Sequence, residues 1–411
     1  VVQGFFELFE VCLSYFSNTL LMAGLGTLLF HLLTKGKVPV FLGSSFAFLG
    51  GYAAVAPMLD GPLGPGTVPN TEMLPYACGG VFCAGLLYAA LAALIRAFGA
   101  KRVMRFFPPV VTGPIIISIG LILAPSAINN CATNWPIALV ALAVVVICNI
   151  WGKGMIKIIP IIMGVIVSYL AALATGAIDF TAFHEESRIF AMAPITLAKF
   201  DVSSILTVMP IALATMMEHI GDISAISATT GVNYIASPGL HRTLLGDGLA
   251  SCLSAFFGGP ANTTYGENTG VLALTKVYDP RVIRIAAFVA IILSFFPKFS
   301  ILIETIPSAI IGGISLILYG PISAVGVRNV VENQVDFTES RNLIIAAIIL
   351  VSALGFNAVG GVTFHVAGTV ITLSGLAIAA ISGIVLNAVL PGNTYDFGSD
   401  PDGDKAVVFK V

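Results

Sequence analysis

Three ionisable side chains stand together in one long apolar stretch, "SILTVMPIALATMMEHIGDISAIS" (204–227). Glu218 and Asp222 are four residues apart and therefore share one face of a helix, whereas His219 is rotated from Glu218 by about 100°. A charged side chain inside a membrane span is costly unless it is paired, neutralised or hydrated. The stretch therefore favours a polar site for substrate and proton over a network that only fixes helix packing. A divalent metal is disfavoured, because no spacing typical of metal ligands accompanies these residues.

A second stretch, "GGPANTTYGENTG" (258–270), places another acid, Glu267, among residues that break helices. The stretch "FLGSSFAFLGG" (41–51) occupies the same place in the first half of the chain. Extended backbone that then becomes helical presents N–H groups and a positive dipole to a ligand. With Glu218 and Glu267 as acceptors, these donors match a small flat molecule that carries both C=O and N–H edges, such as a nucleobase. An inorganic anion would be repelled by the acids, and a metal cation would not match the N–H groups.

Other polar and aromatic residues near these stretches are interpreted either as ligand contacts or as structural residues. Phe46 and Tyr265 stand where the half-helices begin, so their rings either flank a flat ligand or pack against neighbouring spans. Tyr319 and Asn268 are interpreted mainly as packing or capping residues, and Asp247 as a residue at the boundary of a span.

The composition indicates which elements must hold these residues. The chain has 411 residues, of which 57% are hydrophobic and 10% are charged, whereas soluble proteins carry about 25% charged residues. Because a bilayer crossing needs about 20 apolar residues, the sequence predicts an all-α polytopic membrane protein. The candidate spans are 1–16, 18–34, 38–58, 75–99, 106–124, 134–151, 155–176, 204–228, 243–258, 265–279, 281–297, 304–325, 340–356 and 366–391.

The distribution of basic residues supports this count and gives an orientation. With the N-terminus in the cytoplasm, all of the 19 Lys and Arg residues except Arg188, Lys199 and Lys298 fall on the cytoplasmic side. The polar connection 177–203 leaves seven spans on each side, so the second half is expected to be inverted. Residues 106–123 also resemble residues 305–320. Inverted repeats with interrupted spans at matching positions are typical of secondary transporters.

The same residues resemble a known family. "ENTGVLALTK" (267–276) matches the signature of the nucleobase–ascorbate transporter (nucleobase:cation symport) family. "FLGSSFAF", "ATMMEHIGD" and "GGPANTTYGEN" resemble bacterial uracil permeases, and the similarity covers about residues 18–391. The resemblance implies 14 transmembrane segments in two inverted repeats of seven, 1–176 and 203–391, followed by a polar cytoplasmic tail, 392–411. Short antiparallel strands would lie in segments 3 and 10.

The resemblance also implies a division into two domains. A core of segments 1–4, to about residue 100, and 8–11, to about residue 298, would move like an elevator against a gate of segments 5–7 and 12–14. By position, several residues acquire roles that the resemblance implies. Glu218 and Glu267 would hold N–H groups of the base, backbone near Phe46 and Gly266 would meet its carbonyls, and Tyr265 would pack beside it. From the residues themselves, we expect Asp222 with Glu218 to carry the proton, and Asn268, Tyr319 and His219 are candidate supporting residues.

The expected function is proton-coupled import of uracil across the bacterial inner membrane, with both termini in the cytoplasm. Glu267 at the first signature position resembles uracil-type members, so uracil is favoured over a purine such as xanthine or urate. Asp222 departs from the family pattern, since many uracil permeases have His there. Na⁺ is the alternative coupling ion, and an anion exchanger is the less favoured alternative function. We expect no enzymatic activity, cofactor, metal or nucleic-acid partner, and the family implies a homodimer.

Overall fold

The computed structural model describes residues 16–57, 59, 70–180, 183–184, 188–193, 195–366 and 369–392, apart from the side chain of Glu267. Most of the candidate span 1–16 and nearly all of the predicted tail therefore lie outside the described residues. The helices are α2 (Phe16–Leu33), α3 (Leu49–Val55), α4 (Leu74–Phe98), α5 (Ala100–Met104), α6 (Pro109–Thr133), α7 (Trp135–Trp151), α8 (Met155–Ile158), α9 (Pro160–Ala174), α11 (Val202–Val208), α12 (Ala212–Thr230), α13 (Leu240–Phe256), α14 (Glu267–Thr275), α15 (Pro280–Leu293), α16 (Pro297–Glu304), α17 (Ser308–Glu332), α18 (Ser340–Ala358) and α19 (Gly375–Val389). The strands are β1 (Leu42–Ser44), β2 (Asn262–Thr264), β3 (Val362–Val366) and β4 (Thr369–Leu373), and a short helix η1 (Phe46–Phe48) follows β1.

The helices have the length and composition of membrane spans. Within the described part of the chain, six helices are long and apolar enough to cross a bilayer, and a seventh span results if α15 and α16, bent by 94°, are counted together. Four shorter apolar helices add to these. The interrupted segments are divided between a strand and a short helix, so length alone does not recover all 14 predicted segments.

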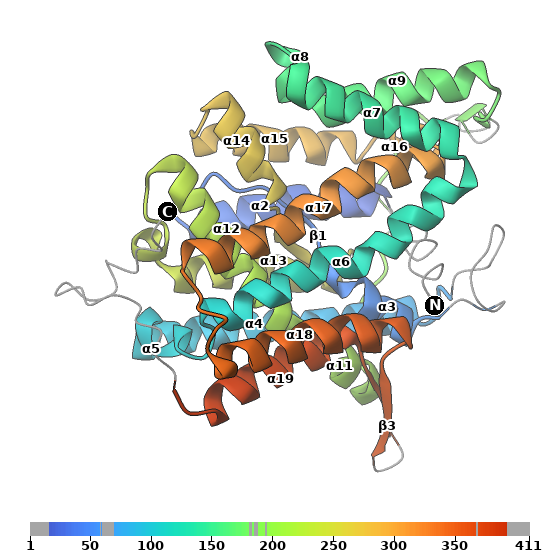
Figure 1. Cartoon of the computed structure of the whole chain (residues 1–411). Helices are drawn as coiled ribbons and strands as arrows, with labels where there is room; N and C mark the ends of the chain where they lie inside the picture. Colours follow the sequence, from blue (N-terminus) through green and yellow to red (C-terminus); the bar gives the residue numbers. More distant parts are fainter. Residues whose placement is uncertain are drawn as a thin grey trace.

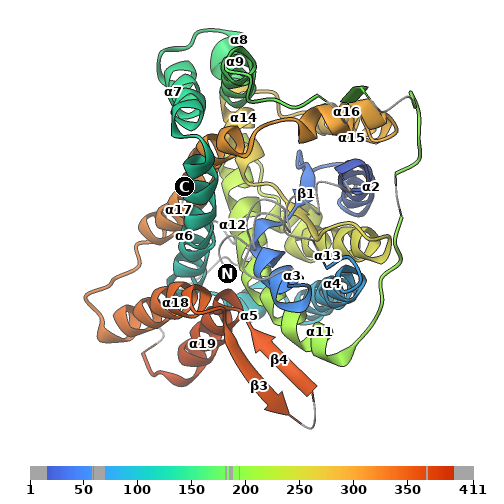
Figure 2. The same cartoon turned by 90° about the vertical axis from the view of Figure 1, so that its right-hand side faces the viewer.

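The helices pack as two groups (Figures 1 and 2). In one group α2, α4, α13 and α15 pack together, and in the other α6, α7, α9, α17, α18 and α19 do so. Helix α12 lies between the groups and contacts α4 and α13 on one side and α6 and α19 on the other. The predicted domain boundaries and their relative movement stay predictions.

Helices α6 and α17 lie side by side in both views, and their backbones approach each other closely. A Cβ atom on Gly120 would lie 2.4 Å from the carbonyl oxygen of Tyr319, and one on Gly326 would lie 2.7 Å from that of Gly113. Small residues permit this packing, which provides dispersion contacts where the hydrophobic effect between helices is absent. The related stretches 106–123 and 305–320 thus contribute to two helices that pack on each other.

The two interrupted segments meet as a strand pair. Strands β1 and β2 are antiparallel, with Leu42 opposite Thr264 and Ser44 opposite Asn262. The ladder extends at both ends, because Ser45 N–H donates to Ala261 O at 2.8 Å and Tyr265 N–H donates to Phe41 O at 3.2 Å. This pairing satisfies backbone groups that would be intolerable against lipid. The predicted pair of short antiparallel strands is confirmed, with β2 ending directly before the predicted start of segment 10 at residue 265.

The last predicted span is correct only in its second part. Residues 362–366 and 369–373 form the antiparallel strands β3 and β4, and α19 begins only at Gly375. Both strands are rich in β-branched residues, "VTFHV" and "TVITL", which favour extended backbone. Ser374 then caps α19 by accepting a hydrogen bond from Ala377 N–H. Hydropathy does not distinguish such a run from a helix, so the prediction of a span beginning at residue 366 was wrong.

Candidate substrate site

A cavity of about 260 Å³ lies where α12 and α14 face α6 and α17. Apolar residues of α6 and α17, among them Ile116 and Ile322, form much of its wall. Its polar lining comes mainly from α12 and α14, with one cation from α17: Glu218, Asp222, Thr229, Gly266, Thr269 and Arg328. An apolar pocket with a few convergent polar groups is the usual form of a small-molecule site.

Glu218 and Asp222 both line this cavity, as their spacing on one helix face predicts. Asp222 is 5% exposed, and its carboxylate lies against the backbone of Gly266 at the start of α14. A Cβ atom on Gly266 would lie 2.3 Å from Oδ1 of Asp222. Only glycine therefore allows α12 and α14 to approach so closely here.

This contact makes Gly266→Ala a sensitive substitution. The added methyl group must displace the Asp222 carboxylate or the first turn of α14, and we expect the initial rate of uptake to fall roughly tenfold or more. Gly270→Ala is the matched control, because Gly270 lines the same cavity but a Cβ there meets nothing within 4 Å. Uptake assays at equal protein level test this, and equal activity of the two variants would contradict it.

His219 faces away from this cavity into a buried hydrogen-bond network. Its Nδ1 donates to Oδ2 of Asp247 at 2.8 Å, and both side chains are almost completely buried, at 1% and 0% exposure. Thr264 also donates to this carboxylate, through its backbone N–H at 3.2 Å and its hydroxyl at 2.8 Å. The network ties α12, α13 and β2 together directly before the start of α14.

The interpretation of Asp247 as a boundary residue was wrong. Its carboxylate lies inside the molecule and holds the strand that leads into the site. The sequence contained a usable signal, because an acid within an apolar span is by default a candidate functional residue. Arg328 was not predicted at all. It lines the cavity and forms an ion pair with Glu332, one turn further along α17.

The predicted aromatic residues lie around the strand pair. The rings of Phe46 and Tyr319 meet edge to face, with centroids 5.5 Å apart and planes at 74°, and so join η1 to α17. The hydroxyl of Tyr265 donates to the carbonyl oxygen of Ser44 at 3.0 Å. A Cβ on Gly43 would lie 2.4 Å from the Tyr265 ring, so this ring packs on β1. Its predicted place beside a ligand stays a prediction.

The remaining predicted residues belong to the first turn of α14. Glu267 is its first residue, and the side chain of Glu267 lies outside the described part of the structure. Asn268 is half-buried, and its backbone N–H donates to Tyr265 O at 3.3 Å. The ligand roles of both side chains stay predictions. In the described part of the chain, no three His, Cys, Asp or Glu side chains gather in a way that could hold a metal ion.

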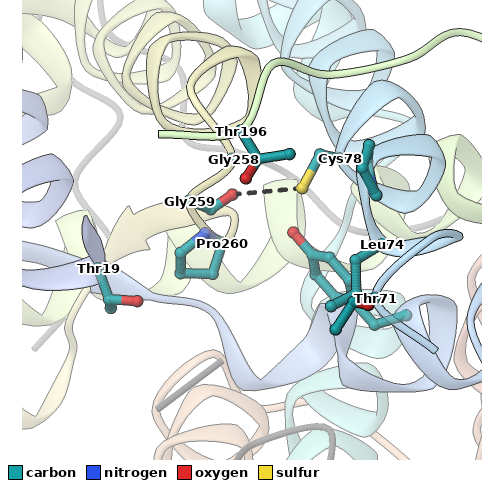
Figure 3. Close-up of a pocket in the computed structure, with 10 residues that line it drawn as sticks. Thr19, Thr71, Leu74, Cys78, Thr196, Gly258, Gly259 and Pro260 are labelled. Carbon is teal, nitrogen blue, oxygen red and sulfur yellow. Dashed lines mark hydrogen bonds between the residues drawn. The ribbon is translucent and has the colours of Figure 1, made fainter. Parts of the chain in front are cut away.

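A smaller cavity of about 30 Å³ lies in the helix group that contains α2 and α4 (Figure 3). Thr19, Thr71 and Thr196 line it, and the thiol of Cys78 is 3.8 Å from the carbonyl oxygen of Gly259. This volume accommodates a water molecule but not a ring-sized ligand. The larger cavity is therefore the candidate substrate site.

Comparisons with known proteins agree on a family and a fold. The profile of the Permease family matches residues 6–362. A uracil permease of Bacillus caldolyticus is 39% identical over 394 residues, which cover 92% of this chain and 86% of the relative. A uracil permease of Escherichia coli K12 is 35% identical, and the match covers 91% of this chain and 84% of the relative. A putative pyrimidine permease of the same organism is 36% identical, and the match covers 92% of this chain and 84% of the relative.

Two solved structures show a similar fold. The transmembrane domain of a cyanobacterial bicarbonate transporter gives a TM-score of 0.50 at 14% identity and covers 95% of this chain and 97% of that one. The murine anion transporter Solute Carrier 26 family member A9, in its inward-facing state, gives a TM-score of 0.57 at 12% identity. The match covers 91% of this chain and 67% of that one. At this identity the likeness concerns the fold alone, and it confirms the predicted fold class of a polytopic helical membrane protein with inverted repeats.

Proposed function

Because this chain belongs to the permease family of nucleobase–ascorbate transporters, which are transporters and not enzymes, we propose that its substrate is uracil. The names of the relatives support this substrate, since several proteins 35–39% identical over most of the chain are uracil permeases. The observation that carries the proposal is the cavity in which Glu218 and Asp222 face the broken start of α14.

The chemistry of this cavity matches the edges of uracil. Carboxylates such as Glu218 accept the ring N–H groups, and backbone N–H groups near Gly266 donate to the carbonyl oxygens. The apolar residues Ile116 and Ile322 cover the faces of the ring. Glu267 adds a second acceptor in this scheme. A buried carboxylate that holds an N–H group also rejects analogues lacking that group, because it would be left unpaired.

The acidic residues of the cavity suggest how uracil transport is coupled to a proton. We assign the transported proton to Asp222 together with Glu218, because a neutral pair crosses the apolar barrier between the helix groups at lower cost than a charged pair. The helices α12 and α14 would move with α2, α4, α13 and α15 relative to α6 and α17, as in an elevator. Transport is inward across the bacterial inner membrane, the termini are cytoplasmic, and the transporter works as a homodimer in this proposal.

Uptake by the purified protein in proteoliposomes tests the function. Radiolabelled uracil is expected to accumulate when an inward proton gradient is imposed, and excess unlabelled uracil is expected to compete. Competition by xanthine alone would identify a purine carrier instead, and competition by sulfate an anion transporter. Uptake that depends on sodium and is indifferent to pH would reject proton coupling.

Asp222→Asn separates binding from coupling. The amide keeps the size of the side chain but does not release a proton at physiological pH, so we expect uracil exchange between equal pools to continue while gradient-driven accumulation is lost. Asp336→Asn is the control, since Asp336 is exposed between α17 and α18 and hydrogen bonds from the Thr338 side chain and backbone lower its pKa. Accumulation by Asp222→Asn equal to that of the control would contradict the assignment.

A further inference from the structure

Thr269 differs from most hydroxyl residues in the helices of this protein. Many of these hydroxyls bond the carbonyl oxygen four residues earlier, as Ser118, Ser168, Ser224, Ser227, Thr229 and Thr230 do. Thr269 is only 9% exposed, yet its Oγ1 has no hydrogen-bond partner among the described residues. A buried hydroxyl without a partner is unfavourable in a protein interior.

The position of Thr269 in its helix explains this. Thr269 is the third residue of α14, so the residue four places earlier, Tyr265, lies before the helix begins. The carbonyl oxygen of Tyr265 accepts the N–H of Asn268 at 3.3 Å, and the N–H of Thr269 bonds Gly266 O at 3.0 Å. At this irregular start of the helix, the Tyr265 carbonyl accepts a backbone N–H and the Thr269 hydroxyl is left without an intrahelical acceptor.

The unpartnered hydroxyl lies in the wall of the 260 Å³ cavity, which Glu218 and Asp222 also line. Carboxylates accept hydrogen bonds when ionised, so they satisfy the N–H groups of a pyrimidine but not its carbonyl oxygens. A hydroxyl supplies a side-chain donor in addition to the backbone N–H groups near Gly266. We propose that the Thr269 hydroxyl binds the substrate directly, by donating a hydrogen bond to one ring carbonyl, and so selects ligands with an oxygen there. This inference rests on the proposed function.

The test compares binding of uracil, 2-thiouracil and 4-thiouracil to the purified full chain by titration calorimetry. Thr269→Val keeps the shape of the side chain and removes the hydroxyl, and we expect it to weaken uracil binding about threefold to tenfold. The wild type is expected to bind one thio analogue less well than uracil, because sulfur is a weaker acceptor. Thr269→Val is expected to lose that discrimination, and Thr269→Ser is expected to restore it.

Thr243→Val is the matched control. Thr243 is buried in the first turn of α13 and does not line the cavity, and its hydroxyl already bonds Leu240 O at 3.0 Å. The affinity of Thr243→Val for uracil is expected to stay within about twofold of the wild type. If the wild type binds uracil and Thr269→Val binds it equally well, this inference is overturned and the proposed function stands. If the wild type binds no pyrimidine, both fail. A melting temperature for each variant separates lost binding from lost folding.

Discussion

Glu218→Gln is expected to weaken uracil binding roughly tenfold to a hundredfold, which is the effect of losing a hydrogen bond to a charged acceptor. Glu218 lies half-buried in the cavity wall, one turn before Asp222 on the same helix face. A carboxylate accepts at both oxygens, whereas the glutamine amide turns an N–H₂ group toward one N–H of the base. Repulsion between these donors adds to the lost attraction. Equilibrium binding of radiolabelled uracil to the purified variant measures the change.

The matched control for this substitution is Glu304→Gln. Glu304 is the last residue of α16, its side chain is exposed, and it does not line the 260 Å³ cavity. Its loss of charge is therefore expected to leave the affinity for uracil unchanged. Equal affinities for Glu218→Gln and Glu304→Gln would place the substrate site elsewhere in the molecule.

Asp247→Asn is expected to lower the free energy of unfolding by about 3 kcal/mol and to abolish uptake, because it breaks a buried charged network. The carboxylate of Asp247 accepts hydrogen bonds from His219, from the backbone N–H of Thr264 and from the Thr264 hydroxyl. An asparagine replaces one acceptor oxygen by a donor, so at least one of these three groups loses its partner. Thr264 is the last residue of β2, which leads into α14. Without these hydrogen bonds, Asp247 no longer fixes the position where α14 begins.

Thermal denaturation of the detergent-purified variant, together with uptake, measures both effects. Asp279→Asn serves as control, because Asp279 is exposed and caps α15 by accepting from Arg281 N–H at 2.9 Å, a bond that asparagine also makes. A melting temperature for Asp247→Asn equal to that of the control would mean that the network does not stabilise the fold. Normal stability without uptake would instead indicate a direct role of Asp247 in transport.

Much of the site followed from local sequence patterns. The apolar spans predict a membrane protein because the bilayer fixes their length and composition. The four-residue spacing of Glu218 and Asp222 predicts a common face because helical periodicity depends only on near neighbours, and both residues line the cavity. The Gly- and Pro-containing stretches predict interrupted spans, and β1 and β2 are found there. Local patterns failed at the start of the last predicted span, where the β-branched run 369–373 forms a strand paired with residues 362–366.

The tertiary structure alone decided which distant groups meet. His219 bonds residues 28 and 45 positions away in the chain, and a sequence pattern with a period of a few residues does not contain such pairs. The contact of Gly266 with Asp222 and the position of Arg328 in the cavity wall depend in the same way on how α12, α14 and α17 pack. Periodicity determines which face of a helix is polar. Only packing determines which groups that face contacts, because these contacts join segments that are far apart in the sequence.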